Sequence, residues 1–343
     1  MSRRRALLVC PGRGSYDRAS LGSLRDRSPA ATAIIARCDA WREAHGRPKV
    51  SAIDAEQTFR TSLHVAGEHA SLLTFACGMA DAATLDADRY EVVGVLGNSM
   101  GWYTALAASG ALSIDDAIRL VDTFGWYQHG NVVGGQVLYP VTDQEWRPAP
   151  DLEEAVDRAI DTVPGAAWSI HLGGFAVLAA GDDGLRALLA ALPPVQRGDR
   201  TFPVQLPLHS AFHTSHLEPT RLRARSDLQD LGFRSPHVPV TDGRGATFRP
   251  LWADPAGLGD YTLGHQVVQP YDFTASLRAA LRHSGPDVVV ALGPGNSLGG
   301  PIARTLVAEG WRGIRTKGDF EAQQRHSPLL LSFGVSVQRK QLT

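Results

Sequence analysis

The sequence predicts an α/β protein with a mostly parallel sheet and a smaller inserted subdomain. Short apolar runs alternate with amphipathic stretches over 1–130, and one of these runs leads directly into the Gly-Asn-Ser-Met-Gly turn at 97–101. The pattern changes over 131–205 and then resumes. Strands separated by helices are typical of parallel sheets that helices cover on both faces. We therefore assign 1–130 and 206–343 to a core and 131–205 to the insertion.

The first part of the core contains apolar strand patterns and Ala- and Leu-rich helix patterns. The predicted elements are a strand at 6–10, helices at 30–45 and 65–85, a strand at 90–96 and a helix at 102–109. Ser113 marks the start of another helix, because serine is a good N-cap and the acidic Asp115 and Asp116 follow in its first turn. The predicted order is therefore strand, two helices, strand and helix, and the turn at 97–101 joins the second strand to the helix that follows it.

Strand and helix patterns alternate over shorter distances in the insertion than in the core. Its predicted elements are a strand at 135–141, a helix at 151–162, a strand at 173–180, a helix at 182–192 and a strand at 204–208. The core pattern returns with a strand at 238–241, a helix near 271–283 and a strand at 287–292 that leads into Gly293-Pro294-Gly295. We expect two layers of different size joined in one chain.

Composition argues against several classes of protein. Among 343 residues, 34 Lys and Arg balance 35 Asp and Glu, and this neutrality does not favour a binder of nucleic acid or of membrane surfaces. The basic Met1–Arg5 precedes an apolar run, 6–10, that is too short for a signal peptide, and no other run is long enough to span a bilayer. Cys10, Cys38 and Cys77 form no CxxC pair. We expect a cytoplasmic protein without disulfides.

Ser99 is the candidate nucleophile. A strand that enters G-x-S-x-G and leaves as a helix is a nucleophile elbow, and Gly97, Ser99 and Gly101 occupy the required places. The glycines allow close approach of strand and helix, and the helix N-terminus can stabilise an oxyanion. The pattern predicts acyl chemistry on a serine.

Several ordered blocks of the chain resemble the malonyl-CoA:acyl-carrier-protein transacylases and the acyltransferase domains of polyketide synthases. The segment GNSMGWYTALAASGALSIDDAIRLV at 97–121 resembles the elbow of that family. The other matching blocks are CPGRGS at 10–15, the Leu-Pro-Leu to Phe-His-Thr segment at 206–214 with Leu-Glu-Pro at 217–219, Gln266 with Pro270, and LGPG at 292–295. The resemblance covers residues 6 to about 310.

The resemblance implies a fold, a site and a reaction. It implies an α/β-hydrolase-like core with a ferredoxin-like inserted subdomain and an active site between them. Ser99 would be acylated, His213 would be its general base, and the backbone carbonyl of Gln266 would orient the imidazole. Backbone N–H groups of Arg13 and Met100 would form the oxyanion hole. The partners would be acyl-CoA and an acyl-carrier protein, with no metal or other cofactor.

Three residues depart from the family pattern. Phe124 stands where malonyl-using members have the arginine that pairs with the malonyl carboxylate, Asn98 replaces a histidine, and Trp102 replaces a glutamate. Together they predict an apolar, uncharged acyl pocket for a monocarboxylic group such as acetyl, a longer chain or an aminoacyl group. Arg13, where the family has glutamine, either reaches a carboxylate from the other side or faces CoA phosphates or solvent.

A metal site is an alternative use of the histidines. His209, His213 and His216 have the spacing of one helix face, which suits a metal, but no Asp or Glu completes a zinc signature. Pro207 and Pro219 bracket the run and disfavour a long helix. The acyltransferase interpretation needs only His213 and leaves the other two at the surface or the groove edge.

Two other functions remain open at this point. A thioester hydrolase acting on carrier proteins would use the same Ser99 and His213 with water as acceptor. A catalytically weak scaffold that binds a carrier protein would explain the departures from the family pattern. The arginines at 221, 223 and 225 either dock an acidic carrier or form a solvated helix face.

Overall fold

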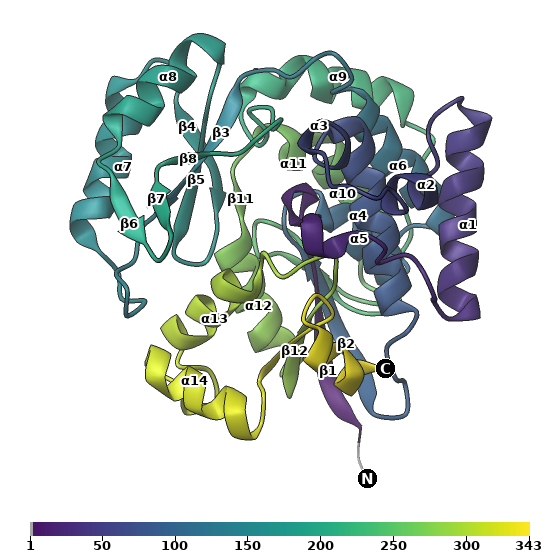
Figure 1. Ribbon diagram of the computed structural model, residues 1–343. Helices are drawn as coiled ribbons and strands as arrows, with labels where there is room; N and C mark the ends of the chain where they lie inside the picture. Colours follow the sequence, from purple (N-terminus) through teal and green to yellow (C-terminus); the bar gives the residue numbers. More distant parts are fainter. Residues whose placement is uncertain (1–2) are drawn as a thin grey trace.

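The computed structural model describes residues 3–343, which form two main sheets of different size and a two-stranded hairpin, and it confirms the α/β prediction (Figure 1). The core sheet has the strand order β10-β9-β2-β1-β12-β13. Its strands are β1 (Arg4–Cys10), β2 (Tyr90–Gly97), β9 (Val240–Thr241), β10 (Thr247–Phe248), β12 (Val288–Ala291) and β13 (Leu330–Ser332). Adjacent strands run parallel, apart from the antiparallel pair β9 and β10.

The centre of the core sheet is the most apolar part of the chain. Residues 6–10 of β1 and all four residues of β12 are buried, as expected for strands covered on both faces. Leu7 pairs with Gly94 of β2 on one side and with Val289 of β12 on the other. This register places the C-terminal ends of β1, β2 and β12 along one edge, from which the loops of the site emerge.

Helices cover both faces of this sheet. One group, which lies above and to the right of the sheet in Figure 1, comprises α1 (Pro29–Ala44), α2 (Val50–Asp54), α3 (Thr61–His64), α4 (Gly67–Ala82), α5 (Gly101–Ala108) and α6 (Ile114–Trp126). The other group comprises α12 (Phe273–Ser284), α13 (Gly299–Ala308) and α14 (Lys317–His326). The predicted cap at Ser113 is present, since its side chain accepts a hydrogen bond from Asp116 N, 3.0 Å away.

The segment between α6 and residue 206 contributes four of the five strands of the second sheet, whose order is β11-β4-β5-β3-β8. Its elements are β3 (Gly135–Pro140), α7 (Pro150–Thr162), β4 (Ala167–His171), β5 (Phe175–Ala180), α8 (Asp182–Ala191), the hairpin β6 (Val195–Arg197) and β7 (Arg200–Phe202), and β8 (Val204–Gln205). Its buried side chains form a separate hydrophobic cluster. The sheet therefore packs around its own small core.

Two features of this sheet differ from the sequence prediction. The strand expected over 204–208 ends at Gln205, because Pro207 has no N–H to continue the ladder and the chain turns toward the core. The edge strand β11 (Tyr271–Asp272) comes from beyond the insertion and pairs with β4. The Tyr271 hydroxyl also donates to the Gly97 carbonyl at 2.7 Å, so this strand connects the second sheet to the elbow.

The remaining helices support the loops around the site and the C-terminus. They are α9 (Glu218–Asp227), α10 (Pro255–Asp260), the π-helical turn η4 (Tyr261–His265), α11 (Gln266–Val268) and α15 (Ser336–Leu342). Among residues 3–343, no helix combines the length and the apolarity that crossing a bilayer requires.

Candidate active site

The elbow between β2 and α5 holds Ser99 in a strained conformation. Ser99 has φ +54°, in the left-handed region that L-residues other than glycine seldom occupy. A Cβ at Gly97 would overlap the Gly101 backbone, and a Cβ at Gly101 would overlap the Cys10 carbonyl at the end of β1. Only glycine fits at both places, which is the physical basis of the motif at these positions.

Ser99, His213 and Gln266 form one line of hydrogen bonds. The Ser99 Oγ lies 2.7 Å from His213 Nε2, and His213 Nδ1 lies 2.6 Å from the Gln266 carbonyl oxygen. Because a carbonyl only accepts, Nδ1 carries the proton and Nε2 is free to accept from the serine hydroxyl. The three residues lie at 99, 213 and 266 in the sequence, and only the fold brings them together.

The electrostatic surroundings keep the imidazole neutral. His213 is 1% exposed, and burial lowers its pKa to about 4, although the hydrogen bond to Gln266 acts in the opposite direction. At neutral pH the ring is therefore uncharged, and its free Nε2 can take a proton from Ser99. A backbone carbonyl stands here where many serine hydrolases have a carboxylate.

Tyr103 is a residue of the site that sequence reasoning missed. Its hydroxyl donates to Gln266 Oε1 at 2.8 Å, while Gln266 Nε2 donates to the Ser99 carbonyl at 3.2 Å. The Gln266 side chain thus joins the first turn of α5 to the turn that orients His213. Its place two residues after Gly101, on the helix that leaves the elbow, was the only signal in the sequence.

Met100 and Arg13 both line the cavity that contains Ser99. Met100 immediately precedes α5, and the first N–H groups of that helix, those of Gly101 and Trp102, donate to the Asn98 and Ser99 carbonyls. Arg13 begins the 3₁₀ turn η1 (Arg13–Ser15) after β1. Asn98 N donates to the Cys10 carbonyl at 2.9 Å, which holds the two loops side by side. The arrangement is consistent with an oxyanion hole, and that role stays a prediction.

A cavity of about 600 Å³ opens in front of Ser99 and is lined by both sheets. The core contributes Asn98, Phe124 and Gln128, and the small sheet contributes Leu138 and Ile170 among others. The ring of Phe124 stacks on Tyr103 with centroids 5.3 Å apart. One wall of the cavity is therefore aromatic where the family resemblance would place an arginine.

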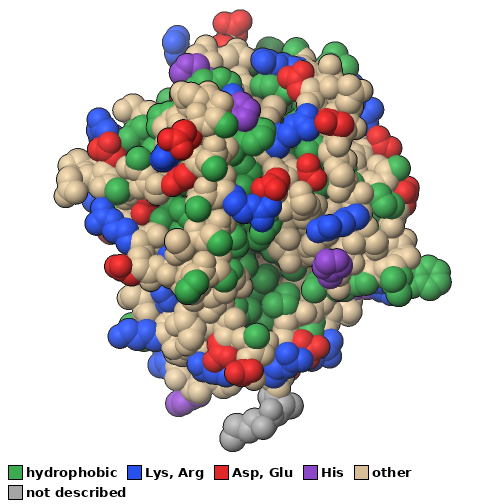
Figure 2. Space-filling view, turned by 90° about the vertical axis from the view of Figure 1, so that its right-hand side faces the viewer, with side chains coloured by type: hydrophobic (Ala, Val, Ile, Leu, Met, Phe, Trp, Pro, Cys, Tyr) green, Lys and Arg blue, Asp and Glu red, His purple; other side chains and the backbone are tan. Residues whose placement is uncertain are grey.

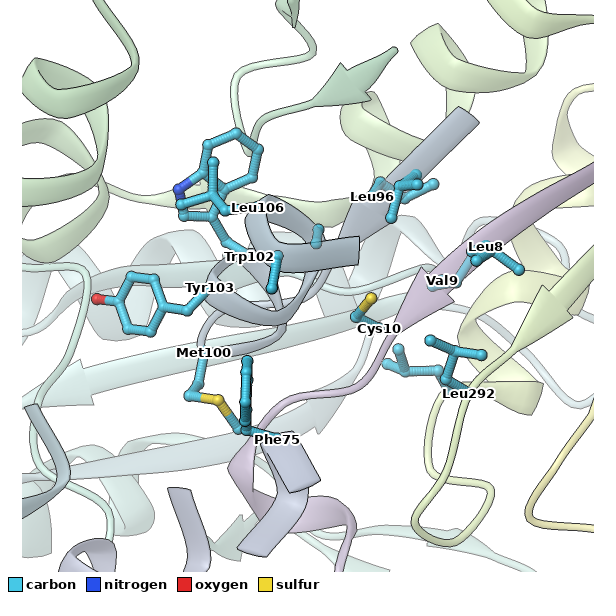
Figure 3. Close-up of a cluster of buried hydrophobic side chains, with 14 of the residues drawn as sticks. Leu8, Val9, Cys10, Phe75, Leu96, Met100, Trp102, Tyr103, Leu106 and Leu292 are labelled. Carbon is cyan, nitrogen blue, oxygen red and sulfur yellow. The ribbon is translucent and has the colours of Figure 1, made fainter. Parts of the chain in front are cut away.

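Trp102 does not line this cavity, so its predicted place in the acyl pocket is wrong. It is 0% exposed, its Nε1 donates to Thr262 Oγ1 at 2.9 Å, and its ring packs edge-on against Tyr261. Consecutive helix residues point about 100° apart, so Trp102 and Tyr103 leave α5 in different directions (Figure 3). Trp102 faces the core, and Tyr103 faces the site.

The prediction of an uncharged pocket is also wrong. The Arg13 side chain is 6% exposed and lines the cavity instead of facing solvent. Its guanidinium donates to Gln128 Oε1 and, at 2.8 Å, to the Leu208 carbonyl. Burial lowers the pKa of Arg13 to about 10, so the side chain remains positively charged at neutral pH.

The three histidines of the possible metal cluster have separate partners. His209 Nδ1 lies 2.9 Å from the Pro207 carbonyl, and His216 Nε2 lies 2.8 Å from the Gly165 carbonyl. Both ring nitrogens of His213 are engaged with Ser99 and Gln266. His209 lines the cavity, whereas His216 contacts the small subdomain.

The arginines of α9 are paired within the chain. Arg221, Arg223 and Arg225 contact Glu218, Asp227 and Asp260, respectively. On the face in Figure 2, Lys and Arg side chains are interspersed with Asp and Glu side chains. The solvated-face interpretation of the three arginines agrees with these pairs.

The chain is similar in sequence to two large synthases. It is 29% identical over 207 residues to polyketide synthase GfsB of Streptomyces halstedii, a match covering 60% of this chain and 3% of that protein. It is 24% identical over 249 residues to hybrid PKS-NRPS synthetase apdA of Emericella nidulans, covering 67% of this chain and 6% of that protein. The chain thus spans a small part of each. No protein-family model matches it.

Solved structures share its fold over nearly the whole length. The malonyl-CoA:ACP transacylase of Synechocystis sp. PCC 6803 superposes with a TM-score of 0.75 at 17% identity, covering 98% of this chain and 100% of that one. The malonyl-transacylase in the PlMCAT:AntF complex with a type II polyketide acyl-carrier protein gives a TM-score of 0.70 at 20% identity, covering 88% and 93%. At such identities, the likeness establishes a common fold.

Proposed function

We propose that this chain, which has the fold of the malonyl-CoA:acyl-carrier-protein transacylases, is an acyltransferase that carries its acyl group on Ser99. The observation that carries the proposal is the hydrogen-bonded line from Ser99 through His213 to the Gln266 carbonyl, set in a cavity that both sheets line. The similarity to polyketide synthases supports the same class of reaction.

In the first half-reaction, the Ser99 hydroxyl attacks the thioester carbonyl and its proton passes to His213 Nε2, 2.7 Å away. The N–H groups of Met100 and Arg13 stabilise the negative oxygen of the tetrahedral intermediate. The C–S bond then breaks, and the leaving thiolate takes the proton from His213. The products are acyl-Ser99 and free CoA thiol.

In the second half-reaction, His213 takes the proton of a phosphopantetheine thiol, and the thiolate attacks the ester carbonyl of acyl-Ser99. The C–O bond breaks and Ser99 Oγ regains the proton. We propose an acyl-carrier protein as the owner of this thiol, because a transacylase of this fold is known in complex with one. Both half-reactions balance with Ser99 and His213 alone, so we propose that no metal or other cofactor takes part.

We also propose that malonyl is not the preferred acyl group. Phe124 occupies the place where the family resemblance puts a carboxylate-binding arginine, and its ring is 5% exposed and stacked on Tyr103. An aromatic ring cannot form the two parallel hydrogen bonds that hold a carboxylate.

The test is intact-mass analysis of the purified protein after incubation with a series of acyl-CoAs, with Ser99→Ala and Ser215→Ala alongside. Ser215 is an exposed serine two residues from His213 and serves as the matched control. We expect an acyl adduct on the wild type and on Ser215→Ala, none on Ser99→Ala, and slower loading from malonyl-CoA than from at least one other donor.

Each part of the proposal has its own contradicting result. An adduct that persists in Ser99→Ala would remove Ser99 as the nucleophile. Fastest loading from malonyl-CoA would overturn the choice of acyl group alone. Release of free acid at the same rate with and without a carrier thiol would show a hydrolase in place of a transferase.

A further inference from the structure

The cavity contains a buried cation with no carboxylate partner. Two of the five N–H groups of the Arg13 guanidinium are used, by Gln128 Oε1 and the Leu208 carbonyl, both uncharged. Among residues 3–343, no Asp or Glu oxygen lies within 4.0 Å of this side chain. Arg13 lies on the cavity wall, where its other three N–H groups are available to a ligand.

The neighbours of Arg13 do not neutralise it. Glu68 acts on it only at longer range and pairs with His129 at 3.2 Å. The nearby His209 is kept neutral, since burial and the Arg13 charge both lower its pKa. Buried charges in proteins are normally paired, because an unpaired one loses its hydration without compensation. A buried, unpaired guanidinium facing an open cavity therefore indicates an anionic ligand.

We propose that Arg13 binds a carboxylate at the free end of the acyl group, which makes the substrate a dicarboxylic thioester. A planar guanidinium with free N–H groups matches a carboxylate in two parallel hydrogen bonds. The proposal rests on the proposed function, because it places the acyl carbonyl at Ser99.

The position of the guanidinium favours the acyl chain over the phosphates of CoA. Its carbon lies 5.9 Å from the ring centre of Phe212, the residue before His213, and its partner Gln128 lies one helical turn beyond Phe124. In acyl-CoA the phosphates are separated from the thioester by the whole pantetheine arm. Because Arg13 lines the same cavity as Ser99, its position favours a carboxylate on the acyl group over a phosphate of CoA.

The proposed carboxylate site at Arg13 also differs in position from the site that an arginine at position 124 would form. An arginine at 124 would extend from α6, whereas Arg13 extends from the turn after β1 and crosses to Gln128. The carboxylate would therefore lie elsewhere in the cavity, which is compatible with an acyl group other than malonyl. A series of chain lengths identifies which dicarboxylic group fits.

The experiment compares donors of equal chain length that differ only in the terminal carboxylate: succinyl-CoA with butyryl-CoA, and glutaryl-CoA with pentanoyl-CoA. The initial rate of adduct formation on Ser99 is followed by intact mass in the wild type, in Arg13→Gln and in Arg13→Lys. We expect the wild type to prefer the dicarboxylic member of at least one pair. Arg13→Gln lowers that ratio about 100-fold, the usual effect of removing one partner of a buried charge pair, and Arg13→Lys lowers it less.

Arg186→Gln is the matched control, because Arg186 is an exposed arginine of α8 that does not line this cavity. We expect it to leave the ratio unchanged. Equal rates within every pair in the wild type would overturn the assignment, and so would an equal fall of both rates in Arg13→Gln or an equal effect of Arg186→Gln. These results are distinct from failure of the proposed function, in which no donor labels Ser99.

Discussion

At the scale of single residues, the two side chains that we propose to react are held in backbone conformations that they would not adopt alone. Ser99 and His213 have φ +54° and +60°, and each such residue costs about 1–2 kcal/mol in an unconstrained chain. Their neighbours enforce the geometry: Gln266 bonds Ser99 and His213 from one side, and His213 N donates to the Val267 carbonyl at 3.0 Å. The strain aims the hydroxyl and the imidazole at each other.

The pH dependence of acylation tests the state of His213. Because burial lowers its pKa to about 4, the base is neutral above that pH and is lost as the pH falls through about 4. We expect the rate of acyl-Ser99 formation at pH 5 to be within about twofold of the rate at pH 7.5. A histidine with the ordinary pKa of about 6.5 would keep about 3% of its rate at pH 5. A midpoint near pH 6.5, with the fold shown intact by circular dichroism, would contradict the neutral, buried base.

At the scale of elements, the site depends on how closely β2 and α5 approach β1. The glycines at 97 and 101 remove the two Cβ atoms that would collide with backbone, and the Tyr271 hydroxyl of β11 bonds the Gly97 carbonyl. The apolar residues of α5 and β1 pack together behind the elbow (Figure 3). Strand, turn and helix are therefore closely packed against one another.

Substitution of Gly101 tests this unit. We expect Gly101→Ala to lower the free energy of unfolding by about 3 kcal/mol or more, since its Cβ would overlap the Cys10 carbonyl and neither backbone can yield. The matched control is Gly318→Ala in α14, where the nearest atom is 3.8 Å from the added Cβ. We expect this control to be neutral or slightly stabilising. Urea unfolding followed by fluorescence measures both, and equal effects would show that the elbow is not tightly packed.

At the scale of the whole molecule, the candidate active site lies where two separately packed sheets meet. The small sheet holds the histidine loop: Gln136 donates to Ser169 at 2.6 Å, and Ser169 donates to the Phe212 carbonyl at 2.9 Å. On the core side, the buried Asp81 of α4 pairs with Arg27 at 2.6 Å and with Arg339 of α15 at 3.5 Å. These polar contacts join segments that are far apart in the sequence.

Neutralising Asp81 tests the larger assembly. Asp81→Asn leaves Arg27, whose side chain is 6% exposed, without a counter-ion, and we expect a loss of about 3–5 kcal/mol in the free energy of unfolding. The control is Glu154→Gln in the exposed pair with Arg158, for which we expect less than about 1 kcal/mol. A shift of the urea midpoint in Asp81→Asn no larger than in the control would show that the buried ion pair contributes little.

Much of this protein could be predicted from its sequence by local signals. Apolar runs in the sequence predicted β1, β2, β5 and β12, because a run of several apolar residues can be recognised without knowing which strand it pairs with. Ser99 was predictable because the elbow needs glycine at fixed spacing on both sides. The strands β4 and β13 were not predicted, because each is short and is defined by pairing with distant neighbours.

Only the tertiary structure decided what surrounds Ser99. The sequence places Trp102 directly after the elbow and Arg13 and Phe124 in more distant segments, but it does not say which of these side chains face the cavity. The fold turned Trp102 into the core and carried Arg13 across to Gln128, so a pocket expected to be uncharged contains a cation. Local patterns determine elements because backbone geometry is local, whereas the direction of a side chain and the charge of a cavity depend on segments that meet only after folding.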